Sequence, residues 1–152
     1  MPIEYHVGNV FLSPAKIIFH GANCQNTMNS GIAREMKQRY PEAYLADLKT
    51  KARDKSKLGT LTYALSESDN RILINLYTQN YYGHDKGHLD YDALKSSLLE
   101  MKDLLKKLKV PEKYMIASGR IGAGLAGGDW DKIAGIIELV FSDKTIHIWD
   151  LK

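Results

Sequence analysis

Residues 119–130 read Gly-Arg-Ile-Gly-Ala-Gly-Leu-Ala-Gly-Gly-Asp-Trp, and four of these glycines fall within the seven residues 122–128. Glycine lets the backbone adopt positive φ and approach a ligand closely, so that successive N–H groups can turn inward as an anion nest. The helix predicted to begin at Asp129 adds free N–H groups and a positive dipole end. The stretch therefore indicates a phosphate-binding loop. The alternative, a flexible connector, has no need of four glycines directly ahead of a helix.

A second loop, residues 21–32, reads Gly-Ala-Asn-Cys-Gln-Asn-Thr-Met-Asn-Ser-Gly-Ile and ends where another helix is predicted to begin. It is rich in amide and hydroxyl side chains, which can hydrogen-bond ribose hydroxyls without adding charge. The alternative is a polar surface loop. We expect the two loops to form a single site for a phosphate-bearing nucleotide.

The chain alternates short β-branched runs with longer helical stretches, which predicts an α/β fold with a mainly parallel or mixed sheet covered on both faces. The predicted strands are residues 3–11 (broken near Gly8), 16–20, 60–65, 71–77, 114–118 and 145–149. The predicted helices are residues 31–40, 42–51, 90–109 and 129–141. Both loops follow strands, so both are expected at the rim beyond the strands' carboxyl ends, where such sheets bind ligands.

Two common nucleotide-binding motifs are excluded or disfavoured. Gly122–Gly127 matches G-x-G-x-x-G, but only one helix and one strand are predicted after it, so the rest of a dinucleotide-binding fold is missing. Residues 21–32 lack the G-K-[ST] of a Walker A loop, which disfavours ordinary ATP chemistry.

Composition favours a single globular domain. The 152 residues are 44% hydrophobic, and 21 basic against 18 acidic residues give a net charge of +3, which is modest for a nucleic-acid-binding domain. One cysteine excludes an intramolecular disulfide, residues 1–6 lack the basic and apolar regions expected of a signal peptide, and no apolar run approaches membrane-spanning length. We expect a cytoplasmic monomer that contacts no membrane.

Three segments together resemble the macrodomain family, whose members bind ADP-ribose. Gly8-Asn9-Val10 is similar to the element that lies against adenine. Residues 23–33 are similar to the loop around the distal ribose, and residues 120–130 to the loop around the diphosphate. The resemblance implies one macrodomain over residues 1–152, a three-layer α/β/α sandwich with a mixed central sheet. It also implies that the chain binds ADP-ribose or an ADP-ribose derivative, without a cofactor or a metal.

The resemblance also implies a set of ligand contacts, although Asn9 stands where many macrodomains have Asp. The expected binding residues are Asn9, Val10, Asn23, Asn29, Ser30, Gly31, Ile32, Arg120, Ile121, Gly122, Ala123, Gly124 and Leu125.

Within the family, the chain resembles the branch that contains yeast-type ADP-ribose-1″-phosphate phosphatases and terminal ADP-ribose-glutamate hydrolases. His20 falls where that branch carries a histidine, and Gly31-Ile32-Ala33 also fits. Gln79-Asn80 and Ala126 stand in place of the Lys and Asp of the glutamate hydrolases, so removal of the 1″-phosphate is the expected reaction. The alternatives are a hydrolase acting on an ADP-ribosylated protein or nucleic acid, and a non-catalytic ADP-ribose reader.

Two residues are expected to carry catalysis, and each has a structural alternative. His20 could transfer a proton or orient the terminal phosphate, or it could be a strand-end histidine satisfied by backbone groups. Asp129 could activate the attacking water, or it could cap the last helix.

Two further chemistries are not expected. Cys24 lies in the first loop, but a cysteine phosphatase needs an Arg where this chain has Ser30, which disfavours a covalent mechanism. His84 and His88 are four residues apart and have no obvious third ligand, so no metal site is predicted.

Overall fold

The structure is a computed structural model that describes residues 3–28, 31–80, 89–121 and 128–151. The described residues form one six-stranded sheet with the order β1-β6-β5-β2-β4-β3. Its strands are β1 (Ile3–Val7), β2 (Ile17–Asn23), β3 (Leu61–Ser66), β4 (Arg71–Gln79), β5 (Ile116–Ser118) and β6 (Ile146–Asp150). Five of these strands pair in parallel, and β3 runs antiparallel to β4 at one edge. The predicted mixed sheet is confirmed.

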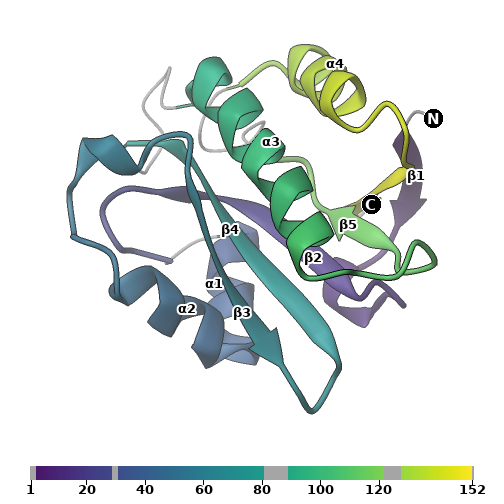
Figure 1. Cartoon of the computed structure of the whole chain (residues 1–152), viewed down its shortest axis with the longest axis horizontal. Helices are drawn as coiled ribbons and strands as arrows, with labels where there is room; N and C mark the ends of the chain where they lie inside the picture. The colour runs from purple at the N-terminus through teal and green to yellow at the C-terminus, as the bar shows by residue number, and fades with distance from the viewer. Residues whose placement is uncertain (1–2, 29–30, 81–88, 122–127, 152) are drawn as a thin grey trace.

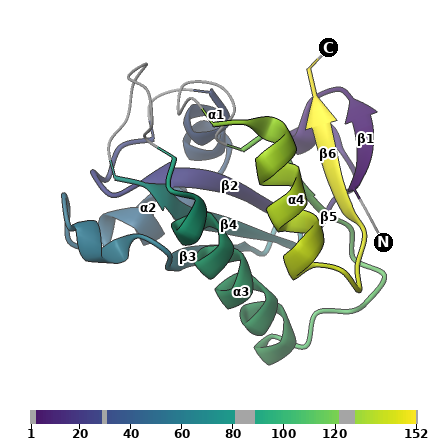
Figure 2. The same cartoon turned by 90° about the horizontal axis from the view of Figure 1, so that it is seen from above.

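Helices cover both faces of the sheet. They are α1 (Gly31–Arg39), α2 (Pro41–Leu48), α3 (Tyr91–Lys107) and α4 (Trp130–Val140), with short 3-10 turns η1 (Val10–Leu12) and η2 (Lys55–Lys57). Figure 1 shows α3 and α4 in front of the sheet, and Figure 2 shows α1 and α2 on its other side. The predicted α/β/α sandwich is confirmed. Within the described ranges, no helix combines the length and the apolar character needed to cross a bilayer.

The face covered by α3 and α4 carries the larger hydrophobic core. The Asp90 carboxylate accepts a hydrogen bond from the Ala93 N–H and so starts α3. Leu94, Leu98 and Met101 then follow at helical spacing, and all three are fully buried. They pack with the buried residues of α4 and with the side chains that β2 and β4 send to this face.

The opposite face is packed by α1, α2 and η1. Met36 and Ala43 are buried there against Ile18 of β2 and Leu73 of β4. Because β2 lies in the middle of the sheet, both of its faces are buried, and it begins with the apolar run Ile17–Phe19.

The ends of β1 and β2 differ most from those predicted. Strand β2 continues to Asn23 instead of ending at His20, because Gly21–Asn23 pairs with residues 76–79 of β4. Strand β1 ends at Val7, since Gly8 takes a φ of 137° and Asn9 begins the η1 turn. The sequence of Gly21–Asn23 is typical of a turn, but pairing with the distant strand β4 makes these three residues part of β2.

Candidate functional site

The two glycine-containing loops follow neighbouring strands. Strands β2 and β5 pair in parallel, so their carboxyl ends lie at the same edge of the sheet. Residues 24–30 connect β2 to α1, and residues 119–129 connect β5 to α4. The topology therefore brings both loops to one rim, as predicted.

Two glycines bring the loops into direct contact. A Cβ atom on Gly119 would lie 2.1 Å from Cδ1 of Ile32, so only a hydrogen fits between the second loop and the first turn of α1. A Cβ atom on Gly21 would lie 3.1 Å from Cγ2 of Ile121. Ile121 is buried and Ile32 is partly buried, so the predicted site residues of the two loops form one packed junction.

Asn9 is held between η1 and α1. Its Oδ1 accepts a hydrogen bond from the Phe11 N–H at 2.9 Å, and its Nδ2 donates to Glu35 at 2.8 Å. The Glu35 carboxylate also pairs with Arg39 at 2.7 Å. The carbonyl oxygen of an amide has two lone pairs, so Asn9 can accept a second hydrogen bond from a ligand. The side chain of its neighbour Val10 is buried in the core beneath.

The side chain of Asn23 forms hydrogen bonds with two later residues of the first loop. Its Nδ2 donates to Oγ1 of Thr27 at 2.8 Å, and its Oδ1 accepts from the Gln25 N–H at 2.9 Å. This Asx turn fixes the path of the chain as it leaves β2. Gly31 then begins α1 with a φ of 56°, a left-handed conformation that costs glycine little.

His20 lies inside the sheet. It is 2% exposed, and its Nε2 is 2.5 Å from Oδ1 of Asn75, the paired residue of β4. The Asn75 amide donates to Ala43 O and Thr62 Oγ1, so its oxygen must accept and His20 Nε2 must carry the hydrogen. Burial lowers the pKa of His20 below its ordinary value, so the ring is neutral. A cross-strand amide is the partner of Nε2, and both this amide and the backbone of Gly21 act to raise the pKa against the effect of burial.

Asp129 caps α4, as the structural alternative predicted. Its Oδ1 accepts a hydrogen bond from the Asp131 N–H at 3.0 Å, and its own N–H donates to Oη of Tyr91 at 3.0 Å. The side chain is exposed, and within the described residues its Oδ2 makes no hydrogen bond. A cap therefore occupies one carboxylate oxygen and leaves the other available.

Arg120 fastens the second loop to the last strand. Its guanidinium pairs with both carboxylate oxygens of Asp150, at 2.7 and 3.0 Å, and this pair raises the pKa of Arg120. The group also lies over the rings of Tyr5 and Trp130, at 5.2 and 5.1 Å from their centroids. The sequence predicted Arg120 as a ligand contact. It gave no local signal for the partners Tyr5, Trp130 and Asp150, which are 115, 10 and 30 residues away in the chain.

The fold agrees with three comparisons. A sequence profile of the Macro domain family matches residues 19–137. An uncharacterized 17.5 kDa protein of Enterobacteria phage T4, from the tk-vs intergenic region, is 36% identical over 158 residues, spanning 99% of this chain and 97% of that protein. The chain belongs to the macrodomain family. Macrodomains bind ADP-ribose, and the family resemblance inferred from the sequence is confirmed.

Solved structures share the macrodomain fold at low sequence identity. The macrodomain of Mycobacterium tuberculosis DarG has a TM-score of 0.80 at 19% identity, with 97% of each chain covered. Thermosipho africanus DarTG, solved in complex with ADP-ribose, has a TM-score of 0.75 at 18% identity, covering 95% of this chain and 41% of that one.

Several predicted site residues of the macrodomain lie outside the described residues. These are Asn29, Ser30, Gly122, Ala123, Gly124 and Leu125, and also His84 and His88.

The one cysteine of the chain, Cys24, directly follows β2. It is fully buried and free, and burial is the main cause that raises the pKa of its thiol, so the thiolate is disfavoured. The burial of this thiol counts against a covalent cysteine mechanism.

A buried lysine under the first loop was missed by the sequence reasoning. Lys57 is 7% exposed and donates to Oδ1 of Asn26 and, at 2.8 Å, to Oγ1 of Thr50. Burial lowers the pKa of Lys57, while Asp47 close by acts to raise it. Since Asn26 belongs to the loop, Lys57 anchors that loop from below. A lysine in a charged run gave no sign of burial.

Two buried hydroxyls were also missed. Thr78 and Ser118 stand near the ends of β4 and β5, both are fully buried, and neither hydroxyl has a hydrogen-bond partner among the described residues. A Cβ atom on Gly21 would lie 2.9 Å from Oγ1 of Thr78, which places that hydroxyl at the loop junction.

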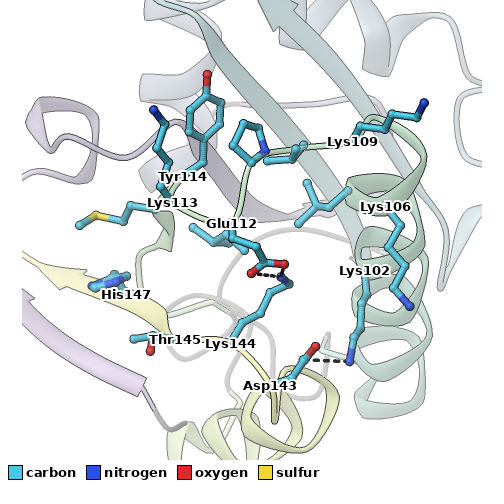
Figure 3. A pocket seen from close by; sticks show the side chains of 15 residues that line it. Lys102, Lys106, Lys109, Glu112, Lys113, Tyr114, Asp143, Lys144, Thr145 and His147 are labelled. Carbon is cyan, nitrogen blue, oxygen red and sulfur yellow. Dashed lines mark hydrogen bonds and ion pairs between the residues drawn. The ribbon is translucent and has the colours of Figure 1, made fainter.

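A cavity of about 560 Å³ lies at the other end of the sheet, where β5 and β6 begin. Figure 3 shows Lys144 pointing at Glu112 and Lys102 at Asp143 across this cavity, at 3.0 and 3.1 Å. Because parallel strands all point the same way, this cavity lies opposite the loop rim. It is not the site predicted for ADP-ribose.

Proposed function

We propose that this macrodomain binds ADP-ribose where its two loops meet and hydrolyses a group on the distal ribose, the 1″-phosphate of ADP-ribose. The observation that carries the proposal is the junction of Ile32 with Gly119 and of Ile121 with Gly21. It sets the amide-rich loop and the glycine-rich loop side by side at the strands' carboxyl ends, where α/β sheets bind nucleotides.

Each segment has a distinct part in this proposal. Asn9 and the backbone of Val10 contact adenine. The backbone N–H groups of residues 120–125 and the start of α4 hold the diphosphate, because a nest of N–H groups at a helix start attracts anions. Asn29, Ser30 and the chain through Ile32 face the distal ribose, while Asn23 shapes that loop.

The reaction chemistry falls to Asp129 more than to His20. Asp129 is exposed beside the glycine-rich loop and keeps one carboxylate oxygen free to orient a water molecule. His20 is buried, neutral and bound to Asn75, so we assign it a positioning role beneath the loop.

Titration calorimetry with ADP-ribose tests the binding step. We expect one ADP-ribose per chain, and the absence of measurable binding would overturn the proposal. The reaction is then tested by phosphate release from ADP-ribose-1″-phosphate, side by side with release of ADP-ribose from a modified protein and a modified DNA. Turnover of a macromolecular substrate alone would replace the phosphatase with a de-ADP-ribosylating hydrolase.

The Asp129→Asn variant tests the catalytic assignment cleanly. Asparagine is as good a helix cap as aspartate, so α4 keeps its first turn while the carboxylate is lost. We expect phosphate release to fall by about 100-fold, the usual contribution of a positioned acid or base. Asp131→Asn, in the first turn of the same helix, is the matched control and should keep its activity. Equal activity of Asp129→Asn and wild type would remove Asp129 from the mechanism.

One observation favours a second candidate function, a non-catalytic reader of ADP-ribose. Of the two catalytic residues predicted from the sequence, His20 is buried and Asp129 already serves as a helix cap. A reader binds ADP-ribose and turns over none of the three substrates, so the same pair of experiments separates the two functions.

A further inference from the structure

Three potential metal ligands gather on strands β1 and β6. Glu4 and His6 are two residues apart on β1, so they share one face of the sheet, and Glu4 pairs in register with His147 of β6. One ligand atom from each of the three lies within 4.8 Å of the others. The opposite face of β1 is used differently, since Tyr5 packs there against Trp130 of α4.

The two histidines are already oriented toward each other. Nε2 of His6 lies 2.8 Å from Nδ1 of His147, and the two rings are stacked with centroids 5.1 Å apart. The His6 ring also stacks on Trp149 at 4.3 Å, which restricts its rotation. The two nitrogens are therefore held close together.

We propose that this cluster binds a divalent transition metal ion, with Zn²⁺ as the expected ion, through His6 Nε2, His147 Nδ1 and the Glu4 carboxylate. Two imidazoles and one carboxylate form a ligand set that suits Zn²⁺ and leaves room for water on the metal. With bonds of about 2.0–2.1 Å, two nitrogens on one ion lie about 3.0–3.4 Å apart. The histidine pair needs to open by only about half an ångström to reach that separation.

The position of Glu4 favours a metal site over a simple hydrogen bond between the two histidines. Such a bond involves only the two rings and leaves the carboxylate unused. Glu4 is exposed, and its carboxylate makes no hydrogen bond or ion pair with another described side chain, so it can close on an ion held by the rings. A metal ion would use all three groups.

The ion would join the first strand to the last one. Strand β1 is an edge strand whose neighbour in the sheet is β6 (Figure 2). It leads through Gly8 into Asn9, the residue assigned to adenine. The ion would thus stabilise the strand from which the adenine-binding element starts. The inference does not depend on the reaction proposed above.

Calorimetric titration of the metal-free, untagged chain with Zn²⁺ tests the site, and Co²⁺ absorption in the visible range reports its coordination. We expect one ion per chain, loss of binding in His6→Asn and His147→Asn, and an affinity at least about tenfold weaker in Glu4→Gln. Zn²⁺ should raise the melting temperature of the wild type and of neither histidine variant.

The matched control is the His84→Asn/His88→Asn double variant, which removes the other histidine pair of the chain and should bind Zn²⁺ as the wild type does. Loss of binding in that control, unchanged binding in His6→Asn, or no binding by the wild type would each overturn the site. Because Glu4 is exposed, Glu4→Gln keeps the test valid even where a histidine variant folds poorly.

Discussion

Gly119 sets how closely the two loops approach each other. A methyl group there would meet Cδ1 of Ile32 at 2.1 Å, the end of a side chain that can rotate away. We expect Gly119→Ala to lower the free energy of unfolding by about 1–3 kcal/mol, because the junction is overpacked. The displaced Ile32 should weaken ADP-ribose binding about tenfold, or 1.4 kcal/mol. Thermal melting and calorimetry measure the two effects.

A compensating variant makes this prediction specific to one atom. Valine lacks Cδ1, so Ile32→Val in the Gly119→Ala background should restore most of the lost stability and affinity. If the stability and affinity lost in the double variant equal the sum of the losses in the two single variants, the contact between these residues does not explain the effect.

The burial of His20 predicts a pH dependence of stability. Its pKa is lowered in the folded chain, while the unfolded chain keeps the ordinary value of 6.5. As pH falls below about 6.5, His20 binds a proton in the unfolded state but not in the folded state, so the free energy of unfolding decreases. The loss should reach about 1.4 kcal/mol per pH unit until the folded-state pKa is passed.

His20→Gln isolates this effect, because glutamine can donate to Asn75 and does not titrate. Chemical denaturation between pH 7.5 and pH 5, with a chelator present, should give a steeper fall for the wild type than for the variant. Parallel curves would show that His20 is protonated with equal ease in both states.

At the scale of single elements, Lys57 holds the first loop in place from η2. We expect Lys57→Met to fill the same space but lose the hydrogen bonds to Asn26 and Thr50, at a cost of about 1–3 kcal/mol. Hydrogen exchange should then become faster at the backbone amides of residues 23–28. Lys55→Met changes an exposed lysine of the same turn and should leave exchange unaltered. Equal exchange in the two variants would show that Lys57 does not anchor the loop.

The sequence predicted the elements well wherever the signal was local. Helix α3 was expected over residues 90–109 and is observed over Tyr91–Lys107, because its apolar spacing and its cap at Asp90 lie in one short segment. Strand β2 was predicted three residues too short, since Gly-Ala-Asn reads as a turn and only pairing with β4 reveals it as strand.

The candidate site, like the elements, was predictable only where its signal was local in the sequence. Alternating strands and helices place both loops on one rim, so the junction could be expected from the sequence. The burial of His20 could not, because its partner Asn75 lies 55 residues away. The same holds for Arg120 and Asp150, and for the histidine cluster that joins the two ends of the chain.

At the scale of the whole molecule, the strand order predicts that the two ends of the chain contribute unequally to stability. Strand β6 lies between β1 and β5, and its residues Ile146 and Ile148 are fully buried. Strand β1 is at the edge and contributes Ile3 as its one buried side chain. Deleting residues 1–7 should therefore leave a folded five-stranded sheet with a lower melting temperature. Deleting residues 145–152 removes an inner strand and should abolish cooperative unfolding, as followed by circular dichroism and calorimetry. If the two truncated chains melted alike, the edge position of β1 would not explain the stability of this sheet.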